Sequence, residues 1–273
     1  MEPGAKYPVD ISRFEVCINP VAGRYPKLRL TNNGRNYIVK FAAYRQNGLE
    51  IPYHISEYAA SRVINSLGYG AHEVWLAVFR GRPGCLVKLF DEPLFTFGGL
   101  GTSTLSGENL PYDLDLLEGI YDDGKFTDVF TSYMWDTFLL DSFILNLDRH
   151  PNNWGFHKLG GLYEPAPLFD NSSSLYSLYA FDLGKITQLE RHIEKFSFSK
   201  ISYKGERMSF RQVLLEEKSR IFQSRLELFI KRLASLDLGF LSIIKNTWPV
   251  NAPYTEFIQN LLGEQVKWFE TEL

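Results

Sequence analysis

The sequence is poor in cysteine, and the two that it has lie far apart. Among its 273 residues the cysteines are Cys17 and Cys85, and no cysteine pair or cysteine–histidine cluster has metal-binding spacing. Two cysteines cannot build a disulfide framework, and a structural zinc site is not expected. This usage is typical of a globular protein from a reducing compartment, so we expect a cytoplasmic location.

Long apolar runs and an excess of basic charge are also missing. No stretch approaches the roughly 18 apolar residues that a membrane-spanning helix needs. The first residues, with Glu2, Lys6 and Asp10, do not resemble a signal peptide. Lys and Arg number 29 against 32 Asp and Glu, which gives a net charge of −3. Proteins that coat nucleic acid or anionic membranes carry a basic surplus, so we expect neither partner.

The composition that is present predicts a folded protein with a large core. Hydrophobic residues make up 45% of the chain, aromatic residues 15% and charged residues 22%, which excludes disorder as the default state. At about 150 residues per domain, the length suits two lobes or one large domain.

The first ninety residues predict a β-rich unit with one helix. Short apolar segments bounded by Gly, Asn or Pro predict strands over 27–30, 37–41, 74–79 and 85–90. Asn33-Gly34 between the first two is a hairpin signal. Residues 56–67 carry a partial helical stripe, and Gly68 is placed to end that helix.

The character of the sequence changes after residue 90. Residues 98–107 are rich in glycine and hydroxyl side chains, which favours a junction or an active-site loop. Helical periodicity follows over 127–147 and 254–271, and 210–236 shows a long amphipathic pattern. We therefore expect an α+β fold, with a small β-rich lobe over 1–90 and a larger helical lobe over 91–273.

One segment carries a pattern that suits phosphoryl transfer. Asp148 is followed five residues later by Asn153, then by a hairpin-like stretch and by Asp170. Phosphoryl transfer needs a carboxylate that orients the attacking hydroxyl and accepts its proton, a role that suits Asp148. It also needs hard oxygen ligands for Mg²⁺, and an amide oxygen with a carboxylate, as in Asn153 and Asp170, can supply them.

A simpler interpretation stays open for the same residues. Asp, Arg, His, Pro and Asn in a row often form only a polar turn, in which Asp148 would act as a cap. The spacing of Asp148 and Asn153 is weak evidence alone. The longer string Asp148-Arg149-His150 through Asn153, followed by Ala-Pro-Leu-Phe-Asp ending at Asp170, is far more specific.

That string resembles the catalytic and metal loops of the HipA-like serine/threonine kinases. Its first part is also similar to the catalytic loop of phosphatidylinositol 3- and 4-kinases. The resemblance implies a two-lobed protein-kinase-like fold that uses ATP and Mg²⁺, with Asp148 as catalytic base and Asn153 and Asp170 as metal ligands. It places His150 close to the transferred phosphate, and the alternative for His150 is a turn histidine bonded to the backbone.

The amino-terminal half is compatible with the same family. Kinases hold the nucleotide phosphates with a strand lysine, and Lys40 lies in an apolar strand pattern. Glu57, at the start of the following helix, could pair with it as the helix glutamate does in kinases. The alternatives are an exposed edge-strand lysine and a first-turn glutamate that favours the helix dipole.

Two further segments complete the expected nucleotide site. Residues 21–27 resemble the phosphate-covering loop of HipA-like kinases, with Gly23 for close backbone approach and Lys27 at its end. Residues 85–90 occupy the place of the hinge between the lobes. Val87 and Leu89 could sandwich adenine while the backbone of Lys88 and Leu89 bonds its edge, and the alternative is a plain buried strand.

The resemblance also bears on acceptors and partners. It implies transfer of the γ-phosphate to Ser or Thr hydroxyls of a protein, such as a translation component, with autophosphorylation and a toxin–antitoxin role. Few residues precede the phosphate loop, as in compact members of the family, so any antitoxin or regulatory subunit is expected on a separate chain. A lipid kinase and a catalytically inactive pseudokinase are the alternatives. Residues 171–176 contain no basic side chain, which disfavours a lipid acceptor.

Overall fold

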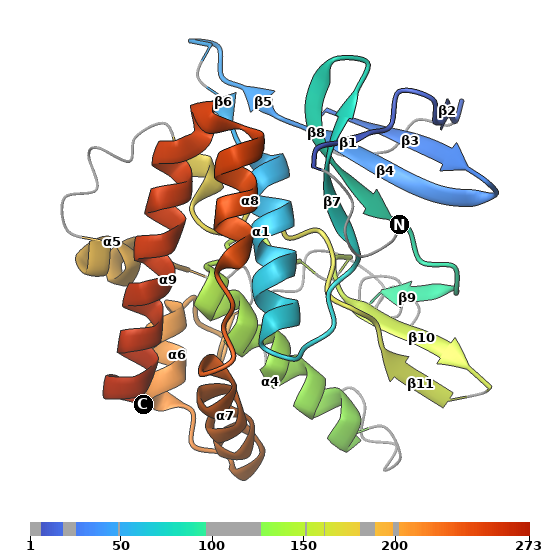
Figure 1. Ribbon diagram of the computed structural model, residues 1–273. Helices are drawn as coiled ribbons and strands as arrows, with labels where there is room; N and C mark the ends of the chain where they lie inside the picture. The colour runs from blue at the N-terminus through green and yellow to red at the C-terminus, as the bar shows by residue number, and fades with distance from the viewer. Residues whose placement is uncertain are drawn as a thin grey trace.

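The amino-terminal part of the protein is built on a curled six-stranded sheet (Figure 1). The computed structural model describes residues 7–18, 26–48, 50–96, 127–150, 152–160, 162–180, 189–198 and 202–273. The sheet order is β1-β7-β8-β4-β3-β2. Its strands are β1 (Val9–Asp10), β2 (Glu15–Val16), β3 (Lys27–Asn32), β4 (Arg35–Phe41), β7 (Val74–Phe79) and β8 (Arg82–Lys88). A short pair, β5 (Ala43–Tyr44) and β6 (Glu50–Ile51), lies beside it.

The four strands predicted from the sequence are present, and two tight turns fix their register. Asn33 and Gly34 both have positive φ, at 50° and 75°, and join β3 to β4 as predicted. Arg80 and Gly81, at 49° and 79°, join β7 to β8 in the same way. Because this second turn is so short, β8 begins at Arg82, three residues earlier than predicted. It ends at Lys88, two residues earlier than predicted.

One helix, α1 (Tyr53–Ser66), crosses between the sheet and the helices that follow (Figure 1). It ends where predicted, next to Gly68 with its φ of 73°. It begins three residues earlier than predicted, because its first turn is buried rather than capped. Glu57 therefore lies in the second turn, and its interpretation as a first-turn glutamate is wrong.

The carboxyl-terminal part is helical and is joined to a small antiparallel sheet (Figure 1). The sheet has the order β11-β10-β9, so the segment just after β8 pairs with the hairpin that follows the Asp148 loop. Its strands are β9 (Leu94–Thr96), β10 (Gly155–Leu159) and β11 (Leu162–Pro165). The helices are α4 (Thr127–Ile144), α5 (Leu189–Phe196), α6 (Phe210–Glu216), α7 (Arg220–Leu233), α8 (Gly239–Thr247) and α9 (Ala252–Glu272), with a 3-10 turn, η2 (Pro249–Asn251). The α+β class is confirmed.

The predicted helices are present, but one is broken in two and another ends early. The pattern over 210–236 is split into α6 and α7, because Glu217 is extended and the Ser219 hydroxyl accepts from the backbone N–H of Phe222 to begin α7. Helix α4 stops at Ile144 because Leu145 has a φ of 51°. The glycine-rich segment 98–107 lies outside the described residues.

The main core extends from α1 and the sheet into the helical part. A continuous cluster of buried side chains includes Val87 from β8, Tyr58 from α1, Phe143 from α4 and Leu168, two residues before Asp170. The two parts of the protein thus share one core, which fixes α1 against the loops that carry the predicted site. None of the helices in the described ranges is long and apolar enough to cross a membrane.

A histidine in this core gives a first testable prediction. The His54 side chain is 1% exposed and lies edge-on to Trp248 at 4.9 Å between ring centroids, and neither of its nitrogens has a hydrogen-bond partner among the described residues. Burial lowers the pKa of His54 to about 3. The unfolded chain therefore takes up this proton first, and stability is lost as pH falls from about 6.5 towards 3.

The His54→Phe variant keeps an aromatic ring without this proton. Between pH 6.5 and 4.5 we expect the wild type to lose about 2 to 3 kcal/mol of unfolding free energy more than the variant. Urea unfolding of both proteins at the two pH values measures the difference. Equal losses in both proteins would show that His54 is protonated in the native state.

Candidate active site

A lysine of the sheet, a glutamate of α1 and the aspartate before Asn171 meet at one point. Lys40 Nζ lies 2.6 Å from Glu57 Oε2 and 2.7 Å from Asp170 Oδ1. Lys40 comes from β4, which is flanked by β8 and β3, so its interpretation as an edge-strand lysine is wrong. The pair of Lys40 and Glu57 expected from the sequence is present, and the contact with Asp170 ties the sheet to the predicted metal loop.

Glu57 is the fixed member of this cluster. Its side chain is fully buried, and its Oε1 atom accepts from the Asn171 backbone N–H at 3.1 Å and lies 2.7 Å from His72 Nε2. Burial would raise the pKa of Glu57, but Lys40 and His72 outweigh it and hold the pKa below its ordinary value. The carboxylate therefore stays ionised and positions both Lys40 and the backbone beside Asp170.

Lys40 is held as a cation by the same contacts. Burial would lower the pKa of Lys40, but the carboxylates of Asp170 and Glu57 outweigh it, and its pKa lies above the ordinary value. The Asp170 carboxylate is 41% exposed. The positive charge of Lys40 lowers the pKa of Asp170 and outweighs the effect of burial, which would raise it. One lysine thus faces two carboxylates, and the exposed side of Asp170 stays accessible.

Lys27 adds a second cation beside the first. It lies directly opposite Lys40 in the β3–β4 register, so the two side chains are on the same face of the sheet. Burial lowers the pKa of Lys27, and the nearby Asp170 carboxylate partly offsets this. Two lysines on one face beside an acidic loop form a site that an anion such as phosphate would stabilise. Gly23, the other residue predicted for the phosphate loop, lies outside the described residues.

The loop that carries Asp148 and Asn153 follows α4 and is organised around Arg149. The Arg149 side chain is 1% exposed and forms a bidentate pair with Asp141 of α4, with both N···O distances at 2.9 Å. Its remaining donors bind the Asn153 carbonyl at 2.8 Å, the Phe169 carbonyl at 2.8 Å and Asn171 Oδ1 at 2.7 Å. Arg149 therefore joins the Asp148 loop to the residues on both sides of Asp170.

The other residues of this loop are placed by backbone contacts. The Asp148 N–H donates to Asn146 Oδ1 at 3.3 Å, and the Asn153 N–H donates to the His150 carbonyl at 2.8 Å. Asp148 is half-buried and Asn153 is buried. The Asn152 N–H donates to His150 Nδ1 at 3.3 Å, which is the backbone-bonded turn that the sequence left as an alternative. The roles of these side chains in transfer stay predictions.

The predicted hinge residues lie at the end of β8. Val87 is buried in the main core. The backbone N–H groups of Lys88 and Leu89 donate to the carbonyls of Glu73 and Asn36, and the Lys88 side chain pairs with Glu73 and Asp91. Both N–H groups are therefore already bonded within the protein. Binding of adenine by the backbone of Lys88 and Leu89 stays a prediction.

Sequence reasoning did not assign three residues that hold the site together: His72, Arg149 and Asp141. Asp141 did carry a signal, because it is an acidic residue on the apolar stripe of a buried helix and such a carboxylate needs a partner. Arg149 lies inside the string that pointed to the site, but its inward orientation is fixed by α4, which the string does not contain. No local pattern marks His72, since it meets Glu57 only through the turn after α1.

The Arg149 cluster supports a prediction about stability. In the Arg149→Met variant, the Asp141 carboxylate would remain buried without its cation, which typically costs about 3–5 kcal/mol. Urea unfolding of the variant and the wild type measures the loss. The double variant Asp141→Leu/Arg149→Met removes both charges and is expected to recover part of it. A single variant as stable as the wild type would rule out this role.

The donors at Asp170 and Asn153 suit a metal that needs few protein ligands. Within the described ranges there is no group of three or more His, Cys, Asp or Glu that could hold a metal by itself. A carboxylate and an amide oxygen are hard ligands of the kind that Mg²⁺ takes together with substrate phosphates. The exposed Asp170 carboxylate beside two lysines fits such a shared site better than an all-protein cage.

These features together define a protein-kinase-like site: a sheet lysine paired with a helix glutamate, an Asp–Asn loop after a buried helix, and an aspartate after the next hairpin. Comparisons with known proteins agree. The chain is 28% identical over 277 residues to the serine/threonine-protein kinase CtkA of Helicobacter pylori, covering 92% of this chain and 84% of the relative. No protein-family model matches the chain.

Solved structures place the fold in the same group. A crystal structure of the proinflammatory kinase CtkA matches with a TM-score of 0.78 at 25% identity, covering 97% of both chains. The Shewanella oneidensis HipA toxin, solved with HipB and operator DNA, matches with a TM-score of 0.52 at 16% identity, covering 94% of this chain and 65% of that one. The chain is thus a homologue of CtkA, an enzyme of the kinase class, with the fold that CtkA shares with HipA.

Proposed function

We propose that the protein is an ATP- and Mg²⁺-dependent kinase that transfers the γ-phosphate to Ser or Thr hydroxyls of a protein. The observation that carries the proposal is the position of Lys40, which bridges the buried Glu57 and the accessible Asp170. The homology to CtkA supports the acceptor class. The small lobe over 1–90 would hold the nucleotide, and the helical lobe over 91–273 the acceptor.

Each residue of the site has a task in this reaction. Lys40 and Lys27 would bind the nucleotide phosphates, with Gly23 allowing the backbone to approach them. Asp170 and Asn153 would hold Mg²⁺, which neutralises charge on the phosphates when it is bound. Glu57, fixed by His72 and the Asn171 N–H, keeps Lys40 extended toward the site.

Asp148 would act as the general base of the transfer. Its carboxylate would accept a hydrogen bond from the acceptor hydroxyl and take its proton as the oxygen bonds to the γ-phosphorus. The bond from that phosphorus to the bridging oxygen of ADP breaks, and ADP leaves. His150, two residues after Asp148, would lie close to the transferred phosphoryl group. Arg149 contacts neither reactant in this scheme and acts by positioning the loop.

The acceptor can be tested directly. The protein is incubated with γ-labelled ATP and Mg²⁺, once with a mixture of Ser- and Thr-containing peptides and once with phosphoinositide vesicles. We expect label in the peptides and none in the lipid. Label in the lipid alone would favour a lipid kinase. Failure to bind ATP with Mg²⁺ in a thermal-shift measurement would favour a pseudokinase.

The proposal extends to partners through the HipA-like fold. HipA was solved with HipB and DNA, and a separate antitoxin or regulatory chain is the corresponding expectation here. A protein substrate from the translation machinery, autophosphorylation and a cytoplasmic location also stay predictions. Copurification of the tagged full-length protein from its native host, followed by mass spectrometry, tests the partner.

A further inference from the structure

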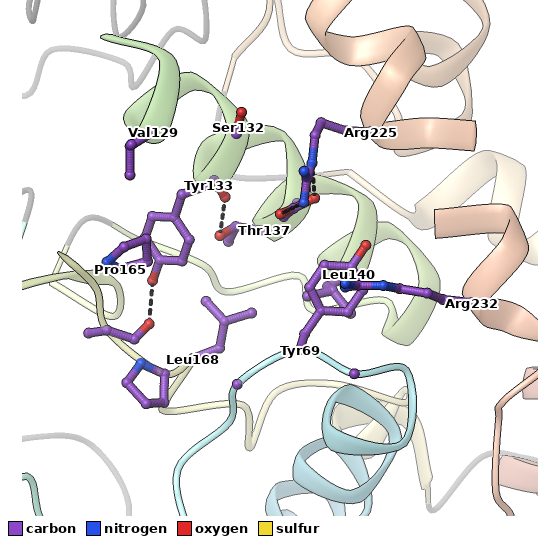
Figure 2. Close-up of a pocket in the computed structure, with 15 residues that line it drawn as sticks. Tyr69, Val129, Ser132, Tyr133, Thr137, Leu140, Pro165, Leu168, Arg225 and Arg232 are labelled. Carbon is purple, nitrogen blue, oxygen red and sulfur yellow. Dashed lines mark hydrogen bonds and ion pairs between the residues drawn. The ribbon is translucent and has the colours of Figure 1, made fainter. Parts of the chain in front are cut away.

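A hollow lies apart from Lys40, between α4, the turn after α1 and the segment that leads to Asp170 (Figure 2). Its volume is about 570 Å³, within the range of about 300–1,000 Å³ typical of small-molecule sites. None of the proposed active-site residues that the structure describes lines it. The cavity therefore needs an explanation of its own.

The two ends of this cavity differ in chemistry. Figure 2 shows Tyr133, Val129 and Pro165 at one end and the arginines Arg225 and Arg232 of α7 at the other. Leu168 lies between them, and Leu140 adds to the apolar lining. A ligand that matches this lining has an apolar body and a polar head.

Of the two arginines, Arg232 is the one available to a ligand. Arg225 is neutralised by Asp136, with its Nε atom 2.7 Å from Asp136 Oδ1. The half-buried guanidinium of Arg232 stacks on the Tyr69 ring, 4.3 Å from the centroid. The Asp136 carboxylate also acts on it, but this carboxylate is already paired with Arg225. The head that best matches this end is a single anionic group.

The walls of the cavity are anchored by backbone contacts. The Leu168 N–H donates to the Gly70 carbonyl at 2.8 Å, and the His72 N–H donates to the Leu168 carbonyl at 3.0 Å. The Tyr133 hydroxyl donates to the Ala166 carbonyl at 2.9 Å. These contacts fix the walls of the cavity, and one wall lies two residues before Asp170.

We propose that this cavity is a binding site for a small amphipathic carboxylate, with an aliphatic or aromatic body between α4 and Leu168 and its head on Arg232. The volume admits a drug-sized molecule, and two arginines against the one carboxylate of Asp136 leave a surplus of one positive charge, which selects a ligand with one negative charge. Binding depends only on the lining, so it does not require the protein to be a kinase.

The test uses decanoate as the probe and decan-1-ol as its uncharged counterpart, titrated into the full chain by calorimetry. We expect decanoate to bind at one site and decan-1-ol to bind at least about tenfold more weakly, since a charge-assisted hydrogen bond is lost. Arg232→Gln should weaken the affinity for decanoate by about tenfold or more. Lys231→Gln removes an exposed neighbouring cation on α7 and should leave that affinity unchanged.

Two further measurements place the ligand. Ser132→Phe, a larger side chain at a half-buried lining position of α4, should abolish binding without affecting the melting temperature of the unliganded protein. Hydrogen exchange should slow at the amides of Leu168 and His72 when decanoate is bound. Absence of binding, equal effects of Arg232→Gln and Lys231→Gln, or protection elsewhere would overturn the proposal. Binding by a protein that transfers no phosphate would leave it intact while refuting the proposed function.

Discussion

Replacing Asp148 by Asn is expected to lower the rate of phosphoryl transfer by about 10²–10⁴, the usual contribution of a general base. Asn keeps the size of the side chain and its ability to accept a hydrogen bond, but it cannot take the proton of the acceptor hydroxyl. The Asp148 backbone N–H bond to Asn146 does not involve the substituted group, so the loop should keep its shape. We expect the loss in kcat, with the affinity for ATP unchanged.

A matched carboxylate outside the site controls for the loss of charge. Asp237 is exposed in the turn between α7 and α8, outside the elements that carry the proposed site, so Asp237→Asn removes the same charge there. This control should retain wild-type transfer. Initial rates with labelled ATP and nucleotide affinities from calorimetry distinguish the variants. An Asp148→Asn protein with wild-type kcat would refute its assignment as the base.

The second large effect is expected at Asp170. Asp170→Asn removes the only charged metal ligand of the proposed pair and one of the two carboxylates that hold Lys40. Removing a group that stabilises charge in the transition state typically costs about 10²–10³ in kcat, so we expect a loss of at least this size. The Mg²⁺-dependent part of ATP binding should be lost with it.

Asn is the right substitution at this position because of the backbone. Asp170 has a φ of 56°, a left-handed conformation that Asn tolerates and most residues do not. The variant should therefore fold, which a melting curve checks. Ser172→Ala removes only a 3.4 Å hydrogen bond to the same carboxylate and should reduce transfer little. If Asp170→Asn binds ATP with unchanged Mg²⁺ dependence, Asp170 is not a metal ligand.

Local patterns predicted the elements that local interactions determine. The Asn33-Gly34 hairpin, the end of α1 at Gly68 and the terminal helix all depend on turn chemistry or periodicity. The break between α6 and α7 was missed because the apolar period continues through it, while the Ser219 cap and the extended Glu217 override the pattern.

Local patterns also predicted part of the site. They singled out Lys40, Glu57 and Asp170 as candidate site residues, and in the structure Lys40 contacts the other two. What local patterns could not supply is the set of long-range contacts that hold them, since His72 and Asp141 act from the turn after α1 and from α4. The cavity at Arg232 shows this most clearly, because its lining comes from four separate segments of the described part of the chain.

The most direct test of the proposed function is one labelling experiment on the full chain. The wild type and the Asp148→Asn variant are incubated with γ-labelled ATP, Mg²⁺ and the peptide mixture, and the labelled residues are mapped by mass spectrometry. We expect label on Ser or Thr residues with the wild type and at least a hundredfold less with the variant. Equal labelling by both proteins, or no labelling by the wild type despite ATP binding, would contradict it.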